Sequence, residues 1–317
     1  MKDVRSFEEF KNDVVGKIRE FLPESFASAE VNLQVIRKNN GLELTALTIT
    51  KQNVNIAPTI YLDKFYEQYK AGEQSFDDVL AEIARLRLEY DCTVDFDTAC
   101  VTDFESCKKR IIPRLINKNE NLTMLENIVH TDIEDLSVIY VIIVNDFDSD
   151  GTASITIRNE FFKNWNITKE ELHNVAMANL RESKPDFEPL SNIIKSIMRK
   201  NFDAENMDVE ELESVLDNMV QIDNELFVLT NENKIYGAAE VLHSEFMDSI
   251  LDRLDSDKFY ILPSSVHEVI IVSPRIAMDI EALREMVESV NTNEVSPDEI
   301  LSYNVYEYSR ENGLQIA

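Results

Sequence analysis

The chain has 317 residues, of which 44% are hydrophobic and 29% are charged, a composition typical of globular proteins and unlike that of disordered chains. Its net charge of −29 comes from 31 basic and 60 acidic side chains, and such an excess of carboxylates repels nucleic-acid phosphates and anionic lipids. We therefore expect no direct nucleic-acid binding and no membrane binding, and the length allows one large core or two modest ones.

The N-terminal sequence and the cysteines indicate the cellular compartment. The first residues lack the apolar run of a signal peptide, and no segment has the roughly 20 uncharged apolar residues that cross a bilayer. Cys92, Cys100 and Cys107 are an odd number of cysteines at spacings that match no zinc-binding motif. We predict a cytoplasmic protein with reduced cysteines, no disulfide framework and no structural metal.

The first predicted element is a helix that opens with a capping box. Ser6 is followed three residues later by Glu9, and apolar residues then recur at helical spacing as far as Phe21. Pro23 marks the end of this helix, because proline cannot continue the hydrogen-bonding pattern.

A hairpin and a pair of helices are predicted next. Segments 30–36 and 42–50 have the composition of strands and flank Asn39-Asn40-Gly41, where Asn and Gly tolerate positive φ. A helix over 60–70 follows and ends at Gly72, and a second amphipathic helix comes after it.

The same order of elements returns three times along the rest of the chain. The later pairs of predicted strands are 137–145 with 152–158, 225–230 with 234–237, and 258–262 with 266–272. The helices that follow them are 168–180, 238–254 and 276–290. Four hairpin-plus-helix units predict an α+β fold, with antiparallel sheets and helices packed on one face.

A domain boundary is expected where the pattern of elements lapses, in the polar and irregular stretch 92–136. Residues 1–110 carry 15 basic and 20 acidic side chains, which leaves 16 and 40 for the rest of the chain. We predict an N-terminal domain over 1–118, with a helix, a hairpin and a helical pair, and an acidic C-terminal domain over 119–317 with three hairpin-helix units. A single continuous domain is the alternative.

Several short motifs are similar to those of a known family. They are Leu22-Pro23-Glu24-Ser25-Phe26, Asn55-Ile56-Ala57-Pro58-Thr59-Ile60-Tyr61-Leu62, Gly151-Thr152-Ala153-Ser154 before Arg158-Asn159, Leu229-Thr230-Asn231 before Tyr236-Gly237-Ala238-Ala239, and Leu262-Pro263-Ser264-Ser265-Val266-His267-Glu268. Over nearly its whole length the chain thus resembles a domain-of-unknown-function family, number 5688, of gut-associated Gram-positive bacteria. The family has no established activity, so the resemblance implies a bacterial protein and no catalytic residues.

One loop has the first half of a calcium-binding motif. Asp146, Asp148 and Asp150 place carboxylates at alternate positions before Gly151, as in a calcium loop, which also needs a bidentate carboxylate at its twelfth position. Here the twelfth residue is Ile157. A solvated hairpin turn is therefore favoured, with weak cation binding as the alternative.

A serine and a histidine near the hairpin at 263–268 are the other weak candidates for a site. A hydroxyl activated by an imidazole is the nucleophile of acyl transfer, so Ser265, His267 and Glu268 invite that hypothesis. A serine leading out of a turn would have to fold back on its own hairpin to meet the ring, and no glycine-rich elbow exposes it. We favour a turn serine and a hydrogen-bonded strand-edge histidine.

Metal-dependent and nucleotide-dependent chemistry are disfavoured. His130, His173 and His243 are scattered and form no pair that would place two ligands on one helix face. The six glycines form neither a GxGxxG motif nor a Walker loop, which close approach to a phosphate requires. We predict no cofactor.

The most unusual feature is the acidic segment 201–257. It holds 16 acidic residues against two basic ones, Lys234 and Arg253, which gives a net charge of −14. In the predicted helix 238–254 the acids, Glu240 among them, are placed toward solvent or at its margins. Our leading hypothesis is a non-enzymatic protein that binds a basic protein through this segment, steered by long-range attraction. The alternative is a hydrolase or transferase of unfamiliar design with a site near the hairpin at 263–268.

Overall fold

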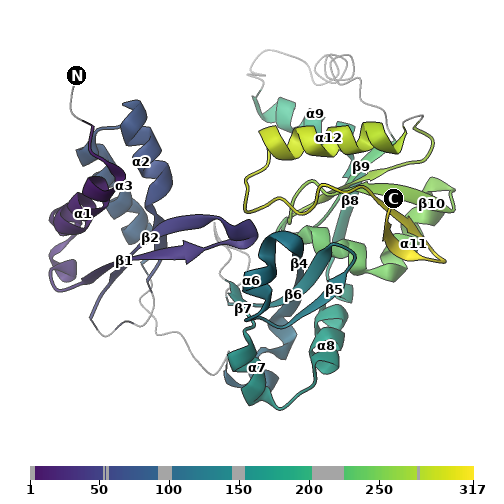
Figure 1. Ribbon diagram of the computed structural model, residues 1–317, viewed down its shortest axis with the longest axis horizontal. Coiled ribbons are helices and arrows are strands. Elements are labelled where there is room, and N and C mark those ends of the chain that lie inside the picture. Colours follow the sequence, from purple (N-terminus) through teal and green to yellow (C-terminus); the bar gives the residue numbers. More distant parts are fainter. Residues whose placement is uncertain are drawn as a thin grey trace. The chain divides into compact units, whose positions relative to one another are not determined.

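The computed structural model describes residues 4–52, 54, 57–91, 102–144, 154–201, 225–276 and 279–317. The chain divides into two compact units, Met1–Thr98 and Ala99–Ala317 (Figure 1). The division falls before the expected boundary at residue 118, because strand β4 (Ile111–Asn117) pairs along its length with β6 (Leu136–Ile143) and belongs to the second unit. Within the described ranges no helix combines the length and apolar character needed to cross a membrane.

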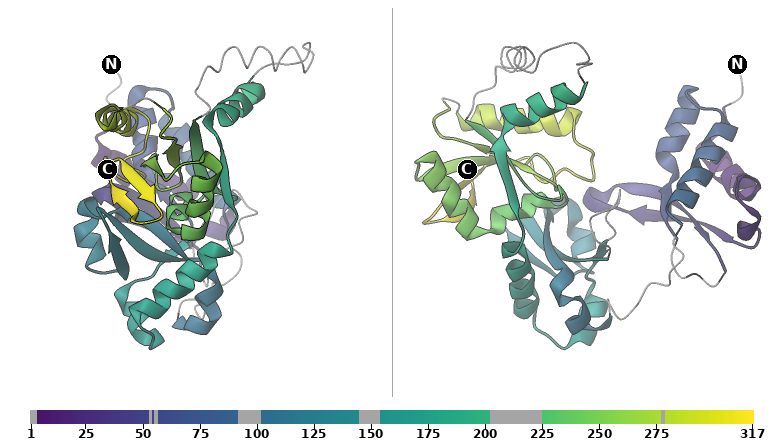
Figure 2. Two further views of the ribbon diagram at one scale, coloured as in Figure 1. Left: turned by 90° about the vertical axis from the view of Figure 1, so that its right-hand side faces the viewer. Right: turned by 180° about the vertical axis from the view of Figure 1, so that it is seen from behind.

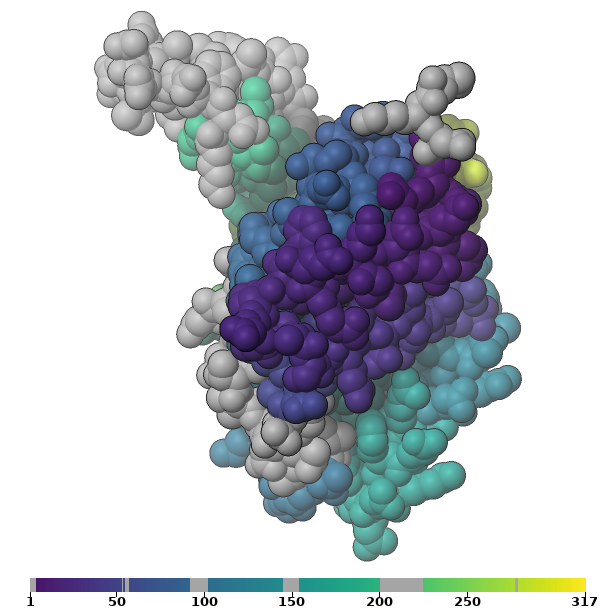
Figure 3. Space-filling model, turned by 90° about the vertical axis from the view of Figure 1, so that its left-hand side faces the viewer, coloured from purple at the N-terminus to yellow at the C-terminus, as the bar shows by residue number. Residues whose placement is uncertain are grey.

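The first unit is a three-stranded antiparallel sheet covered by three helices. Its strands, in the order β1-β2-β3, are Glu30–Arg37, Glu43–Thr50 and Thr59–Tyr61, and its helices are α1 (Phe7–Lys17), α2 (Leu62–Ala71) and α3 (Phe76–Glu89). Short 3-10 turns, η1 (Ile18–Phe21), η2 (Glu24–Phe26) and η3 (Asn39–Gly41), join the elements. In the space-filling view, α1 and the hairpin in purple form a continuous surface with the blue helices (Figure 3).

The local signals in the first unit act as predicted. The Ser6 hydroxyl accepts a hydrogen bond from the Glu9 backbone N–H, and the Glu9 carboxylate accepts one from the Ser6 N–H, at 2.8 Å. Gly72 ends α2 with a φ of 78°, the left-handed conformation that glycine adopts without steric cost. Val31 and Leu33 in β1 lie opposite Ile49 and Leu47 in β2, and all four side chains belong to the core beneath the helices.

The second unit begins with a four-stranded sheet. Strand β6 pairs with β4 on one edge and with β5 (His130–Ile133) and β7 (Ser154–Thr156) on the other. Its neighbouring helices are α5 (Phe104–Cys107), α6 (Leu122–Leu125), α7 (Asn159–Trp165) and α8 (Lys169–Arg181), with 3-10 turns η4 (Lys108–Arg110) and η5 (Asn119–Asn121). All eight residues of β6 are buried, because α6 packs near Ile139 while His173 of α8 bonds to Tyr140 on the opposite face.

A six-stranded antiparallel sheet completes the second unit. Its order is β13-β12-β10-β11-β9-β8, and the strands are β8 (Pro185–Pro189), β9 (Leu226–Asn231), β10 (Lys258–Leu262), β11 (Val269–Val272), β12 (Tyr306–Ser309) and β13 (Gly313–Ile316). The associated helices are α9 (Leu190–Asn201), the 3-10 helix η6 (Gly237–Leu242), α11 (Ser244–Leu254) and α12 (Ile280–Asn293).

Helices cover both faces of this sheet, whereas the sequence pattern predicted helices on one face. Helix α12 packs on the face that carries Leu262 and Val272. Helix α11 lies on the other face, where its Asp248 accepts a hydrogen bond from Tyr308 and Tyr308 stacks on Phe259. Figure 2 shows α12 in yellow on one side of the sheet and α11 in green on the other. Because β10 and β11 are apolar at nearly every position, burial of a single face would leave hydrophobic side chains in water.

The fold is α+β as predicted, but the repetition of hairpin-helix units is not confirmed. Strands β6 and β7, and β10 and β11, do pair as predicted hairpins. Strand β9 instead pairs with β8 and β11, and the predicted second strand over 234–237 is a turn that leads into η6.

One carboxylate joins the two sheets of the second unit. Asp135, in the turn between β5 and β6, accepts hydrogen bonds from Ser302 at 2.7 Å, Asn304 at 2.9 Å and Tyr306 at 2.5 Å. Burial and the adjacent Asp135 carboxylate raise the pKa of the Tyr306 hydroxyl above its usual range, so Tyr306 remains a donor at all ordinary pH values. The contact fixes the segment before β12 against the four-stranded sheet.

Candidate functional site

The turn after β9 has a strained backbone. Lys234 and Tyr236 have φ values of 55° and 56°, and a bulky residue in this left-handed region is uncommon and costs about 1–3 kcal/mol. Asn231 closes the turn, since its amide nitrogen donates to the Ile235 carbonyl at 2.8 Å and its amide oxygen accepts from the Ile235 N–H at 3.2 Å.

Tyr236 is held by contacts from several elements. Its backbone N–H donates to Nδ1 of His267 at 3.3 Å, and the two rings stack with centroids 5.7 Å apart. The Arg114 guanidinium of β4 lies 4.5 Å from the tyrosine ring centroid, and the tyrosine hydroxyl bonds with that of Ser154 in β7 at 3.1 Å. These contacts account for the persistence of the strained turn and connect it to both sheets.

The next residue, Gly237, allows the chain to pass very close to β9. A Cβ atom there would lie 2.3 Å from the Thr230 hydroxyl, 2.6 Å from the His267 carbonyl oxygen and 2.7 Å from the Asn231 nitrogen. Only glycine fits this space, and η6 begins directly against the end of the strand as a result. Glu240 lies three residues further along η6.

Glu240 is a carboxylic acid that is completely buried, with 0% of its surface exposed. Ser183, just beyond the C-terminal end of α8, donates a hydrogen bond from its hydroxyl to Oε1 at 2.7 Å. Oε2 has no hydrogen-bond partner among the described residues, and Nδ1 of His243 lies 3.9 Å from it. Burial raises the pKa of Glu240 to about 7, because desolvation disfavours the charged carboxylate.

A pocket of about 260 Å³ lies beside this carboxyl group. Its wall comes from β4, from the C-terminal end of α8 and from the turn between β9 and η6. The lining residues are Ile112, Pro113, Asn179, Leu180, Glu182, Ser183, Lys184, Asn231, Glu232, Asn233, Ile235, Tyr236 and Glu240. We call it the Glu240 pocket. A pocket with convergent polar groups and a residue of strongly perturbed pKa is a site candidate on physical grounds.

The residues suggested near the 263–268 hairpin form a turn. The Ser265 hydroxyl accepts from the His267 backbone N–H at 3.0 Å, and the Ser265 N–H donates to the Glu268 carbonyl at 3.0 Å. The hydroxyl of Ser265 therefore bonds to the backbone of His267 and not to its imidazole. Nε2 of His267 lies 3.7 Å from Glu299, and burial lowers the pKa of the ring. Strand β11 begins only at Val269, after these residues.

Five other residues considered from the sequence lie outside the described ranges. They are Asp146, Asp148 and Asp150 of the calcium-like loop, and Cys92 and Cys100. Cys107 is a buried thiol in α5. Within the described ranges, no group of three or more His, Cys, Asp or Glu residues is arranged to hold a metal ion.

The acidic segment 201–257 is described at residue 201 and over 225–257, because residues 202–224 lie outside the described ranges. Several carboxylates of the later part are engaged within the fold. Asp252 pairs with Arg310 at 2.5 Å, Asp248 bonds to Tyr308, Glu232 pairs with Lys184 and Glu225 lies 3.7 Å from Arg275. Binding of a basic protein through the other carboxylates of this segment stays a prediction.

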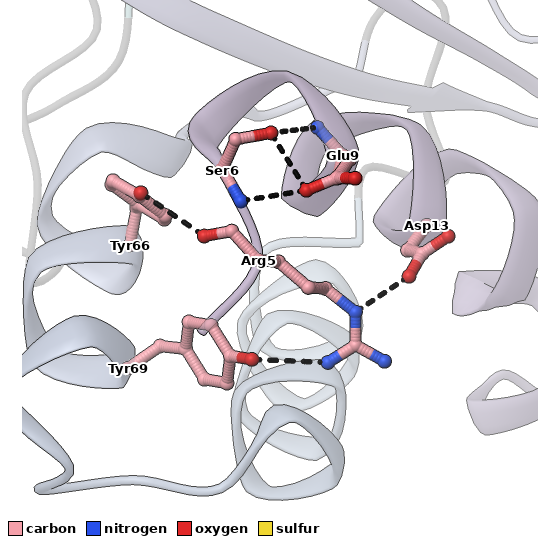
Figure 4. Close-up of polar contacts among 6 residues, drawn as sticks. All are labelled: Arg5, Ser6, Glu9, Asp13, Tyr66 and Tyr69. Carbon is pink, nitrogen blue, oxygen red and sulfur yellow. Dashed lines mark hydrogen bonds and ion pairs between the residues drawn. The ribbon is translucent and has the colours of Figure 1, made fainter. Parts of the chain in front are cut away.

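A second polar cluster lies at the start of the first unit (Figure 4). Arg5 donates from Nε to Asp13 at 2.6 Å and from Nη1 to the Tyr69 hydroxyl at 3.1 Å, and its guanidinium lies 4.2 Å from the Phe76 ring centroid. The Tyr66 hydroxyl donates to the Arg5 carbonyl at 3.1 Å. Surface grooves lie on either side, but the guanidinium is engaged by α1, α2 and α3, so we assign Arg5 a structural role.

Replacing Arg5 by alanine is expected to lower the stability of the first unit by about 1–2 kcal/mol, through loss of a charge-assisted bond, a tyrosine bond and a ring contact. Urea unfolding by circular dichroism, with hydrogen exchange to localise the effect, measures the change. Arg85→Ala is the control, because Arg85 is exposed and pairs with Glu82 and Glu89 of its own helix α3, and exposed pairs of this kind contribute little to stability. Equal effects of the two replacements would contradict the structural role.

Comparison with known proteins identifies a family. The model of a family described as "Family of unknown function (DUF5688)" matches residues 7–310. The chain belongs to this family. No curated protein matches the chain, and no solved structure matches it. The family description supplies no activity and no site residues, so any function of this chain has to be argued from its structure.

Neither Glu240 nor Ser183 was predicted as a site residue from the sequence of this DUF5688 chain. Glu240 was expected toward solvent or at the margin of the apolar face, on an α-helix over 238–254. The structure instead has a 3-10 helix over Gly237–Leu242 before α11. One signal was available, since Glu240 is the single charged residue in the apolar run Gly237-Ala-Ala-Glu-Val-Leu242. A glutamate in such a run can be buried with its neighbours when another residue pairs with its carboxyl group. No local pattern pointed to Ser183, whose partner is 57 residues away.

Proposed function

We propose that the protein binds a small polar molecule in the Glu240 pocket. The observation that carries the proposal is a carboxyl group that is completely buried in the pocket wall and has only one of its two oxygens hydrogen bonded within the described structure. An unsatisfied buried polar group costs about 1–3 kcal/mol, so its retention calls for a functional reason. The volume lies near the lower end of ligand pockets, about 300 Å³, which favours a small ligand.

The charges around the pocket favour binding over acyl transfer. Ser183 donates to Glu240, an acid whose pKa of about 7 suits a general base, so the pair resembles a nucleophile with its base. Acyl transfer also needs hydrogen-bond donors around a developing oxyanion. The C-terminal end of α8, which carries the negative end of the helix dipole, lies at this position instead. Negative charge on a substrate oxygen would be destabilised there.

A ligand screen on the full-length protein tests the proposal. Thermal unfolding followed by Trp165, the single tryptophan and a residue of the second unit, should shift upward for at least one small polar metabolite. A ligand at 100 times its Kd stabilises by about 2.7 kcal/mol. Hydrogen exchange should then show protection of 179–184 and 231–240. Absence of any stabilising compound at millimolar concentration, or protection confined to other segments, would overturn the proposal.

A further inference from the structure

We propose that the group bound in the Glu240 pocket is a cation, an ammonium or a guanidinium, that donates hydrogen bonds to the Ser183 hydroxyl oxygen. This inference rests on the proposed function and adds the chemical class of the ligand. Three features of the pocket carry it: the hydrogen-bonding role of Ser183, the sign of the surrounding charges and the buried acid behind the serine.

Ser183 is set up as an acceptor. Its hydroxyl has one hydrogen, and that hydrogen is donated to Oε1 of Glu240 at 2.7 Å. The lone pairs of the oxygen are then available, and a ligand group at this position has to be a donor. Ser183 is half-buried while Glu240 is fully buried. A ligand in the pocket would thus contact the Ser183 hydroxyl and interact with the Glu240 carboxyl group through it.

The fixed charges around Ser183 are predominantly negative. The pocket wall holds three carboxyl groups, those of Glu182, Glu232 and Glu240, against one lysine, Lys184. That lysine is paired with Glu232, with Nζ 3.1 Å from Oε2. The last turn of α8 adds the partial negative charge of a helix C-terminus beside Ser183. Each of these contributions favours a cation and opposes an anion.

The other titratable groups near Glu240 leave this balance in place. His243 lies 3.9 Å from Oε2, and burial lowers its pKa, so it is neutral near pH 7. Arg181 lowers the pKa of His243 further, and Glu245 acts in the opposite direction. Among the described groups facing the acid, no cation lies close enough to neutralise it. A bound cation would supply the missing charge and favour the ionised carboxylate.

Binding of a cation is therefore expected to be coupled to release of a proton from Glu240. A ligand that requires the ionised form binds about tenfold more tightly at pH 8 than at pH 6 when the acid has a pKa of about 7 in the free protein. About half a proton is released per ligand at pH 7 by the same linkage. A neutral ligand would show neither effect.

Calorimetry on the full-length protein tests the inference with three cations, putrescine, agmatine and L-arginine, and one neutral isostere, 1,4-butanediol. Amines of this kind remain protonated at pH 6–8, so the ligand charge stays constant. We expect at least one cation to bind, with the tenfold pH effect, and the diol not to bind. Titration in buffers of different ionisation enthalpy measures the released proton.

Variants separate this inference from the proposed function. Glu240→Gln keeps an acceptor for Ser183 and should remove the pH effect and the proton release and weaken cation binding at pH 8 at least tenfold. Glu288→Gln, on the exposed side of α12, should bind as the parent does. If the metabolite screen finds only neutral or anionic ligands protecting 179–184 and 231–240, the cation inference is overturned while the proposed function stands. Binding of the diol as tightly as putrescine overturns it equally.

Discussion

Replacement of Gly237 by alanine is expected to lower the free energy of unfolding of the second unit by about 3 kcal/mol, at the upper end of the cost of overpacking. The added Cβ would lie 2.6 Å from the His267 carbonyl oxygen and 2.7 Å from the Asn231 nitrogen, besides 2.3 Å from the Thr230 hydroxyl. Two of these three atoms are backbone atoms and cannot rotate away. Relief requires that η6 moves off β9, and Tyr236 and Glu240 would move with it.

Urea unfolding followed by Trp165 fluorescence measures this loss in the second unit. Gly313→Ala is the matched control, because Gly313 belongs to the same unit and a Cβ there meets no atom within 4 Å. Its φ of 67° still disfavours alanine, so a loss of about 1 kcal/mol is expected. The close approach at Gly237 would be contradicted if the two variants lost equal stability. Adding Thr230→Ala to Gly237→Ala should recover only part of the loss.

Features that depend on a few neighbouring residues could be predicted from the sequence. The capping box at Ser6 and the helix end at Gly72 are present as expected. Each arises from hydrogen bonds or backbone conformations within about four residues, and the chain carries all the information locally. The β1–β2 hairpin belongs to the same class, since its turn fixes its register.

Pairings between distant segments could not be predicted in the same way. Strand β4 lies in a stretch taken to be irregular, yet it pairs along its whole length with β6. Strand β9 was expected to form a hairpin with 234–237, but its partners are β8 and β11. The Asn231-Glu232-Asn233 turn is compatible with either outcome, and the contacts of Tyr236 with Arg114 and His267 decide between them. Those contacts exist only once both sheets are assembled.

The candidate site illustrates the same limit at a single residue. The prediction for Glu240 assumed 3.6 residues per turn, whereas η6 is a 3-10 helix with about 3.0 residues per turn, and this changes which side chains share a face. Gly237, Ala238, Ala239, Glu240 and Val241 are all buried. The helix is enclosed on several sides, so no amphipathic pattern applies to it.

Replacement of Glu240 by glutamine is expected to stabilise the second unit by about 3 kcal/mol at pH 8 and to change its stability little below about pH 4.5, since a pKa shift of one unit is worth about 1.4 kcal/mol. The carboxyl group has a pKa of about 7 in the folded protein against 4.5 in its ordinary state. The folded protein holds the extra proton between these values, so stability from this group is complete below about pH 4.5 and is lost as the pH rises through 7. Glutamine stays neutral and keeps the acceptor for Ser183.

The measurement is the difference in unfolding free energy between parent and Glu240→Gln at pH 4.5, 6, 7 and 8, by urea unfolding and Trp165 fluorescence. The difference isolates one acid from the 60 in the chain, because the other carboxylates titrate alike in both proteins. Glu288→Gln, at an exposed position of α12, provides the control. If the difference in unfolding free energy between the parent and Glu240→Gln did not change with pH, the carboxyl group would titrate normally and would not be desolvated. A cationic ligand that requires the charged form should reduce the advantage of glutamine at pH 8, since it stabilises the parent alone.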